Sequence, residues 1–216
     1  MRESINVFAY NLYLDRFALD FVVKKRSGSK QPDARIFSGE EEIAEIKRET
    51  EGKNFRLVRR KDGLEWSLTN NVHGEPRPFS FSVHKLAKGE RRDKHGDLDS
   101  EPLKDEIFVI REQLFKHNGK LYMLANHPMG KHWDEHVHDA VKYIGRLDGF
   151  DDAELSQVDY QSRDLRHKIK RLRGTAVGEA SGLGIDEQGH RVRLDDELAD
   201  VGLFIAAISY LMYAAA

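Results

Sequence analysis

The chain contains no cysteine, so disulfide bonds and cysteine-ligated metals are excluded. This composition fits a reducing compartment, and we expect the protein to be cytoplasmic. The first residues, MRESINVFAYNLYLDR, lack an apolar run of signal-peptide length, which supports the same expectation. Charge of one sign is also lacking, because charged residues make up 33% of the chain while the formal net charge is only -2. No field over the whole molecule therefore points to nucleic acid as a partner.

Long apolar runs are scarce except at the carboxyl end, in Leu194 to Ala216. Asp195, Asp196 and Glu197 open this stretch, where a helix N-terminus favours negative charge, and Asp195 is a candidate N-cap. The apolar side chains that follow lie on every side of a helical projection, so the predicted helix 195–213 must be buried in protein or lipid. Its apolar part gives about 24 Å of helix, slightly short for a bilayer. We expect burial in protein, with a carboxy-terminal tail anchor or a partner-docking helix as alternatives.

Two segments have the pattern of β-hairpins. Residues 55–71 and 109–126 each place apolar-alternating arms around a tight-turn dipeptide, Asp62-Gly63 in the first and Asn118-Gly119 in the second. A weaker copy follows Gly189, with apolar residues at matching offsets. The three segments represent either a duplicated β-unit or the ordinary similarity of hairpins.

Other segments are predicted to add strands and a loop. Residues 5–24 are rich in aromatic and β-branched side chains, which favours one or two strands, and residues 79–83 alternate like a half-buried strand. Residues 39–50 fit either a short helix or an edge strand. Residues 88–103 are highly charged and nearly free of apolar side chains, which indicates a long mobile loop. We interpret residues 1–216 as a single domain.

The period changes beyond the second hairpin. Residues 131–146 follow helical spacing, with a strand over 140–147 as the alternative. Apolar residues recur at i, i+4 and i+7 within 163–173, which indicates a basic amphipathic helix. The glycine-rich residues 175–184 are predicted to be flexible or tightly turned.

The repeated turns and the apolar terminal segment DDELADVGLFIAAISYLMY together resemble the tubby-like superfamily, which includes phospholipid scramblases and plant LURP-one-related proteins. In that superfamily a closed antiparallel β-barrel wraps around a hydrophobic C-terminal helix. The resemblance therefore implies a mainly β, α+β fold of this kind, here with one or two extra helices. A barrel removes the edges of a sheet, and its interior can bury a helix that is apolar on every face. The resemblance supplies no catalytic residues, because members are mostly described as lipid-binding or partner-binding modules.

A zinc-like motif lies in HWDEH, residues 132–136, which matches the H-x-x-E-H arrangement of inverted zinc peptidases. On a helix, His132 and His136 would share one face and could chelate Zn²⁺, leaving Glu135 to activate a water molecule. The alternatives are a structural or adventitious metal and an exposed polar helix face. The motif normally belongs to a larger α/β peptidase, whereas this chain is short and mainly β.

Two further motifs are candidates for binding. A basic cluster interleaved with apolar residues would suit an anionic membrane surface, with a solvated helix face and nucleic acid as the alternatives. It consists of Arg163, Arg166, Lys168, Lys170, Arg171 and Arg173. Aromatic side chains for stacking bases are absent from this cluster, so we expect no nucleic acid. Gly178, Gly182 and Gly184 resemble a phosphate loop, but the residues that follow read as a hairpin turn rather than as a helix.

These observations lead to the hypothesis of a non-enzymatic binding module. We expect an anionic phospholipid or a regulatory protein as its partner and a cytoplasmic location, peripheral to a membrane. The expected lipid-binding residues are Arg166, Lys168, Lys170, Arg171 and Arg173. No cofactor or metal is expected. The alternatives are a zinc-dependent hydrolase built on His132, Glu135 and His136, and a tail-anchored membrane protein.

Overall fold

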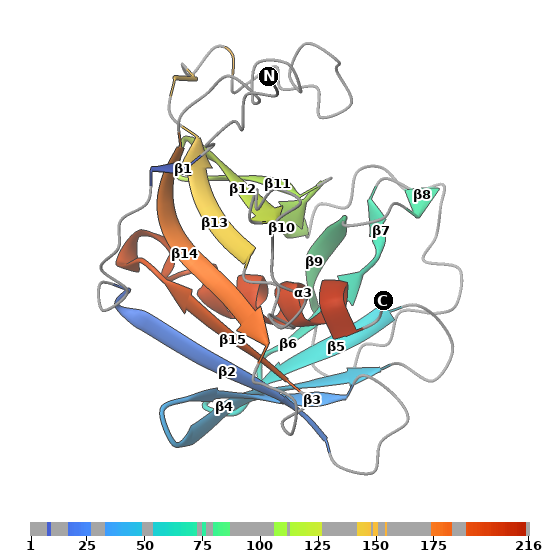
Figure 1. The fold of residues 1–216 in the computed structure, drawn as a ribbon. Helices are drawn as coiled ribbons and strands as arrows, with labels where there is room; N and C mark the ends of the chain where they lie inside the picture. The colour runs from blue at the N-terminus through green and yellow to red at the C-terminus, as the bar shows by residue number, and fades with distance from the viewer. Residues whose placement is uncertain are drawn as a thin grey trace.

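A computed structural model gives the fold of the protein (Figure 1). It describes residues 8–9, 17–26, 33–48, 54–72, 75–76, 80–86, 106–111, 113–126, 142–147, 149–150, 154, 174–182 and 189–214.

The described residues are mainly β-structure. In chain order the strands are β1 (Phe8–Ala9), β2 (Leu19–Lys25), β3 (Ala34–Ser38), β4 (Glu41–Arg48), β5 (Asn54–Arg59), β6 (Glu65–Thr69), β7 (Asn71–Val72), β8 (Glu75–Pro76), β9 (Phe81–Leu86), β10 (Glu106–Ile110), β11 (Leu114–His117), β12 (Lys120–Asn126), β13 (Lys142–Leu147), β14 (Gly174–Gly182) and β15 (Gly189–Leu194). The helical elements are the 3-10 turn η2 (Asp196–Leu198) and the α-helix α3 (Gly202–Ala214).

Twelve of these strands form one antiparallel sheet that curls into a nearly closed barrel. Their order around the barrel is β10-β9-β6-β5-β4-β3-β2-β15-β14-β13-β12-β11. The short strand β1 joins this sheet alongside β14, and β7 pairs with β8 in a separate small sheet. Figure 1 shows the strands encircling α3, so the expected barrel around a C-terminal helix is confirmed.

Alternating side chains explain why each strand has one buried face. On β4, Ala44 and Ile46 are at most 1% exposed, whereas Glu45 and Lys47 alternate with them on the outer face. Such alternation suits an antiparallel sheet with one apolar side, and burying an aliphatic side chain contributes about 1.5–3 kcal/mol. Residues 41–48 therefore form a central strand. Both expectations for the segment 39–50, a short helix and an edge strand, are wrong over this part, because β3 and β5 flank β4.

Helix α3 supplies the centre of the core. The ring of Phe204 packs edge-on against Trp66 of β6, with ring centroids 5.3 Å apart, and lies 6.0 Å from the ring of Phe108 in β10. On another side of the helix, Gly202 lies beside Phe21 of β2 and Leu194 of β15. Contact with strands in several directions explains why the helix is apolar on all its faces.

The helix prediction needs two corrections. Residues 195–213 do not form one continuous helix, because η2 ends at Leu198 and α3 begins only at Gly202. Asp195 has an extended backbone before η2, and its side chain makes no capping hydrogen bond. The alternative of a tail anchor was based on the apolar character of residues 195–213. In the structure the apolar side chains of this segment are buried in the hydrophobic core among the strands. None of the described helices combines the length and the hydropathy that a bilayer span requires.

The hairpin expected at 55–71 is confirmed, and the one expected at 109–126 is confirmed over 114–126, because its first arm breaks between Ile110 and Leu114. Strands β5 and β6 flank the turn that contains Gly63, and β11 and β12 flank Asn118-Gly119. Asn118 and Gly119 have φ of 46° and 69°, which a two-residue turn with two positive φ values requires and which this dipeptide tolerates. The expected strand at 79–83 also exists, as β9.

Two expectations at the end of the barrel are wrong. Residues 142–147 form strand β13, so the predicted helix 131–146 fails over that part and the strand alternative is correct. The glycine-rich residues 174–182 form strand β14 rather than a flexible turn. Gly178 suits this strand because a Cβ at that position would lie 2.7 Å from Cδ2 of Leu194 and 2.8 Å from the carbonyl oxygen of Arg193. The charged residues 88–103 and the segment 155–173 lie outside the described residues.

Candidate functional site

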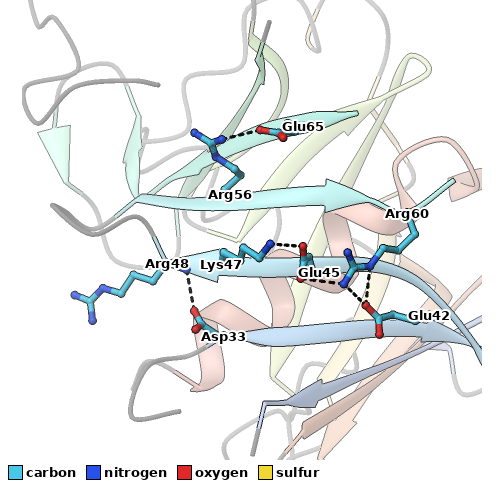
Figure 2. Close-up of polar contacts among 8 residues, drawn as sticks. All are labelled: Asp33, Glu42, Glu45, Lys47, Arg48, Arg56, Arg60 and Glu65. Atoms are coloured by element: carbon cyan, nitrogen blue, oxygen red, sulfur yellow. Dashed lines mark hydrogen bonds and ion pairs between the residues drawn. The ribbon is translucent and has the colours of Figure 1, made fainter. Parts of the chain in front are cut away.

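The outer face of β3, β4 and β5 carries a network of ion pairs (Figure 2). Arg60 donates to Glu42 at 2.7 Å and to Glu45 at 3.0 Å, and Lys47 also pairs with Glu45. The hydrogen bond to Glu42 is the main reason that the pKa of Arg60 is raised above its ordinary value. Each of these cations therefore has a carboxylate partner on the barrel wall.

The same matching continues on neighbouring strands. Arg56 of β5 donates to Glu65 of β6 at 2.7 Å, as Figure 2 shows. Other cations on the outer wall are paired in the same way: Arg35 with Glu42, Arg191 with Asp20, and Arg193 with Glu179. These parts of the outer wall are thus rich in charge but locally neutral, which leaves little field there to attract an anion.

Three cations at one end of the barrel differ from the paired arginines and lysine described above. Lys25 is the last residue of β2, Arg26 follows it, and Arg48 is the last residue of β4. Among the described residues, no carboxylate forms an ion pair with any of these three side chains, and Figure 2 shows the Arg48 side chain directed away from the others drawn. We call Lys25, Arg26 and Arg48 the rim cations.

Strand pairing brings the rim cations together. The backbone N–H of Arg26 donates to the carbonyl oxygen of Asp33 at 2.8 Å, and the backbone N–H of Arg48 donates to the Asp33 carboxylate at 2.9 Å. Lys25 pairs across the sheet with Ala34, which directly follows Asp33 in the chain. The start of β3 therefore holds the ends of β2 and β4 on either side of it.

The C-terminal half of α3 lies at this end of the barrel. The helix starts near Phe21 at the beginning of β2, and Tyr210 lies close enough to Asp33 to sense its charge. Burial raises the pKa of Tyr210 to about 12, and the negative charge of Asp33 adds to the effect. A helix C-terminus carries partial negative charge, so cations near it are favourable.

At the opposite end of the barrel, one carboxylate brings several polar side chains together. Glu197 of η2 accepts hydrogen bonds from Arg146 at 2.8 Å, from Lys120 at 3.1 Å and from the Tyr122 hydroxyl at 3.3 Å. Burial, followed by the charge of Glu197, raises the pKa of Tyr122 far above its ordinary value. This arrangement ties the segment before α3 to β12 and β13, and we interpret it as structural.

A buried polar group on β6 and β9 has the elements of a nucleophile and a base. Ser82 Oγ lies 2.8 Å from Nε2 of His84 and 2.8 Å from the Thr69 hydroxyl. Ser82 and His84 are each 1% exposed, however, so a substrate has no access to the serine. The group satisfies the buried hydroxyls of Thr69 and Ser82 and Nε2 of His84, and it is not a candidate active site.

The site residues predicted from the sequence mostly lie outside the described residues. This holds for the zinc motif at His132, Glu135 and His136, so a metal-dependent hydrolase stays a prediction. It holds equally for the predicted lipid-binding residues Arg166, Lys168, Lys170, Arg171 and Arg173. Within the described part of the chain, no three His, Cys, Asp or Glu side chains are grouped as metal ligands would be.

The structure does test part of the predicted phosphate loop. Gly178 and Gly182 lie in strand β14, so they do not form a loop around a phosphate, while Gly184 falls outside the described residues. Sequence reasoning missed the rim cations. Their signal was the run Lys24-Lys25-Arg26 at the end of a strand, which looks like any other charged strand end until its neighbours are known.

Comparison of the chain with protein-family models, with curated proteins and with solved structures finds no match in any of the three. The fold alone, a nearly closed twelve-stranded barrel with one central helix, is compatible with the tubby-like architecture.

Proposed function

We propose that the protein is a non-enzymatic binding module that recognises an anionic phospholipid surface. One observation carries the proposal. Arg35, Arg56 and Arg60 on the barrel wall have carboxylate partners, whereas Lys25, Arg26 and Arg48 at the rim have none among the described residues. A cation without an ion-pair partner loses no existing ion pair when an anion arrives, so the rim is suited to a phosphate group.

The expected strength of this interaction is modest. A basic side chain near an anionic membrane contributes about 1 kcal/mol, so three rim cations supply about 3 kcal/mol, which is roughly a hundredfold in affinity. The interaction weakens as salt is added, because the screening length falls to about 10 Å at 0.1 M ionic strength. The predicted basic cluster at 166–173 would add to this attraction as a second, separately testable set.

The resemblance to the tubby-like superfamily is part of the same proposal. The barrel around an apolar helix is the feature shared with that group, whose members the resemblance describes as lipid-binding or partner-binding modules. On this basis we propose a cytoplasmic protein that associates peripherally with membranes. A regulatory protein with an acidic surface is the competing partner, and vesicle binding separates the two.

Co-sedimentation with vesicles tests the proposal. Vesicles of phosphatidylcholine alone are compared with vesicles that also contain phosphatidylserine, using the full chain and a variant that carries K25S, R26S and R48S. The matched control carries R35S, R56S and R60S, which removes the same charge from paired wall cations. We expect the rim variant to bind anionic vesicles about tenfold to a hundredfold more weakly, and the wall variant to change much less.

Two results would contradict this proposal. Equal recovery of the unaltered protein with neutral and anionic vesicles would exclude an anionic lipid surface, and an acidic protein partner would become the better hypothesis. Equal losses in the rim and wall variants would show that net charge matters rather than unpaired cations. A further variant measures the contribution of the predicted basic cluster. It carries serine in place of Arg166, Lys168, Lys170, Arg171 and Arg173.

A further inference from the structure

Two tight turns of the barrel differ in how their glycines are held. Gly63 follows Asp62 in the first turn, and its backbone N–H donates to the carbonyl oxygen of Arg59 at 2.9 Å. Gly119 follows Asn118 in the second turn, and its N–H makes no hydrogen bond among the described residues. Both Asn118 and Gly119 are exposed. The backbone nitrogen of Gly119 is therefore not engaged by this part of the protein.

The side chains that precede the two glycines differ in the same way. The Asp62 carboxylate accepts hydrogen bonds from Nε of Arg59 at 3.0 Å and from the backbone N–H of Leu64 at 3.1 Å. The hydrogen bond from Arg59 is the main reason that the pKa of Asp62 is lowered. Among the described residues, the Asn118 side chain has one polar contact, of 3.0 Å between its Nδ2 and Nε2 of His117. Asp62 is thus held as a carboxylate, whereas Asn118 presents an uncharged amide.

An asparagine that precedes a glycine can lose its amide nitrogen without an enzyme. The backbone nitrogen of the glycine gives up its proton and attacks Cγ of the asparagine. The bond from Cγ to Nδ2 then breaks, ammonia leaves with a proton taken from the solvent, and a cyclic succinimide remains. Water opens this ring at either carbonyl group and gives aspartate or isoaspartate. Asn118 is the only asparagine in the chain that precedes a glycine, which has no side chain to hinder the attack.

We propose that Asn118 is a site of spontaneous deamidation in the folded protein. Ring closure requires the peptide bond between Asn118 and Gly119 to rotate out of the present turn, in which both residues have positive φ. Space does not separate the two turns, because nothing lies within 4 Å of a Cβ at Gly63 or at Gly119. Hydrogen bonding does separate them. Rotation at Gly63 breaks its bond to Arg59, whereas rotation at Gly119 breaks no described hydrogen bond of that glycine.

Deamidation changes both the charge and the length of the turn. Either product carries a carboxylate in place of the amide that contacts His117, and Asp200 already lies 3.2 Å from the same histidine nitrogen. Isoaspartate also routes the main chain through its former side chain, which adds one carbon atom to the backbone. The turn then lacks the two-residue geometry that fixes the register of β11 and β12. The modification therefore limits how long this hairpin keeps its form.

Ageing of the unaltered protein tests the proposal. The folded protein is incubated at mildly alkaline pH, and ion-exchange chromatography separates the acidic species that accumulates. Mass spectrometry of its peptides locates the new carboxylate, and chromatography of the modified peptide separates the aspartyl from the isoaspartyl form. We expect modification at residue 118 with both forms present, because the ring opens at either carbonyl group. Absence of an acidic species, or an aspartyl form alone, would overturn the proposal.

A second asparagine-glycine pair in the same molecule is the matched control. The variant D62N places this dipeptide in the first turn, where the N–H of Gly63 is bound to Arg59. We expect the introduced asparagine to convert about twofold to tenfold more slowly than Asn118, because one hydrogen bond must break first. In guanidinium chloride the two positions should convert at similar rates, since neither turn is then present. Equal rates in the folded variant would mean that the dipeptide alone decides, which contradicts the structural argument.

The variant N118S provides a separate check. It removes the reacting amide but keeps a small polar residue in the turn, so the acidic species should be lost. Its persistence at the same rate would place the reaction at another residue and would overturn the proposal. These measurements do not involve vesicles or the rim cations, so deamidation and lipid binding fail separately.

Discussion

Arg146 of β13 donates a hydrogen bond of 2.8 Å to Glu197, the residue of η2 that lies just before the central helix. Lys120 and Tyr122 of β12 donate to the same carboxylate. One acidic side chain therefore fastens the start of α3 to two strands at the end of the sheet. The apolar helix depends on packing for most of its stability, but this carboxylate fixes where the segment before it meets the barrel.

Replacing Glu197 by glutamine should destabilise the protein. The amide keeps the shape of the side chain but loses the charge, and its own donors then face the donors of Arg146 and Lys120. We expect the free energy of unfolding to fall by about 1–3 kcal/mol, the range for hydrogen bonds that involve charged groups. Urea denaturation at neutral pH measures the effect. D196N is the matched control, because it removes the same charge from an exposed neighbour, and an equal loss there would refute the explanation.

Truncation of the central helix at a fully buried position should cost more than truncation at its partly buried face. Ile205 is 0% exposed, and Leu203 is only partly buried against the core. I205A should lower the free energy of unfolding by about 2–5 kcal/mol, because it removes buried methyl groups and leaves a cavity. L203A should cost about half as much or less. Denaturant midpoints of the two variants check the order, and a reversed order would mean that the helix is seated differently.

The close approach of β14 and β15 at Gly178 should make this position intolerant of alanine. A Cβ there would lie 2.8 Å from the carbonyl oxygen of Arg193, a backbone atom that cannot rotate away. We expect G178A to lower the free energy of unfolding by about 1–3 kcal/mol, the cost of overpacking. Hydrogen exchange should speed up at Arg193 and Leu194 in this variant. In G39A the same amides should be unaffected, since nothing lies within 4 Å of a Cβ at Gly39 and only its positive φ is strained.

Local signals explain which parts of the fold could be predicted from the sequence. The Asn118-Gly119 turn needs two positive φ values, and few other dipeptides accept them. The apolar terminal segment can be satisfied only by burial on all faces, and a barrel made of the predicted strands provides this. Both predictions rest on residues that are neighbours in the chain, so no knowledge of the tertiary structure was required.

Two wrong predictions depended on contacts between distant residues. The helical spacing of 131–146 extends into β13, where pairing with β12 and β14 imposes a strand instead. Gly178 indicated a flexible turn, but its lack of a side chain lets β15 pass close by. In both places the sheet overrides the local preference of the sequence.

The rim cations could not be identified from the sequence for the same reason. Lys25 and Arg48 are far apart in the chain and lie at the same end of the barrel only because β3 pairs with both β2 and β4. Arg60, which follows the end of β5, is in contrast neutralised by Glu42 and Glu45. Pairing, rather than residue type, separates a free cation from a structural one.

Tyr210 should make stability depend on alkaline pH. Its hydroxyl is buried and has no hydrogen-bond partner among the described residues, and its pKa is raised from 10.0 to about 12 by burial and then by Asp33. The folded state thus prefers the protonated phenol more strongly than the unfolded state does. This contribution to stability is complete below pH 10 and is lost as the pH rises from 10 to 12.

Replacing Tyr210 by phenylalanine isolates this effect, because Tyr122 titrates equally in both proteins. At neutral pH, Y210F should be as stable as the unaltered protein or up to about 1 kcal/mol more stable, because an unpartnered buried hydroxyl is costly. Between pH 10 and pH 12 the unaltered protein should lose on the order of 2 kcal/mol relative to Y210F. Urea denaturation across this pH range measures the difference. A variant that is clearly less stable at neutral pH would mean that the hydroxyl has a partner, and two parallel pH profiles would mean that its pKa is not raised by burial beside Asp33.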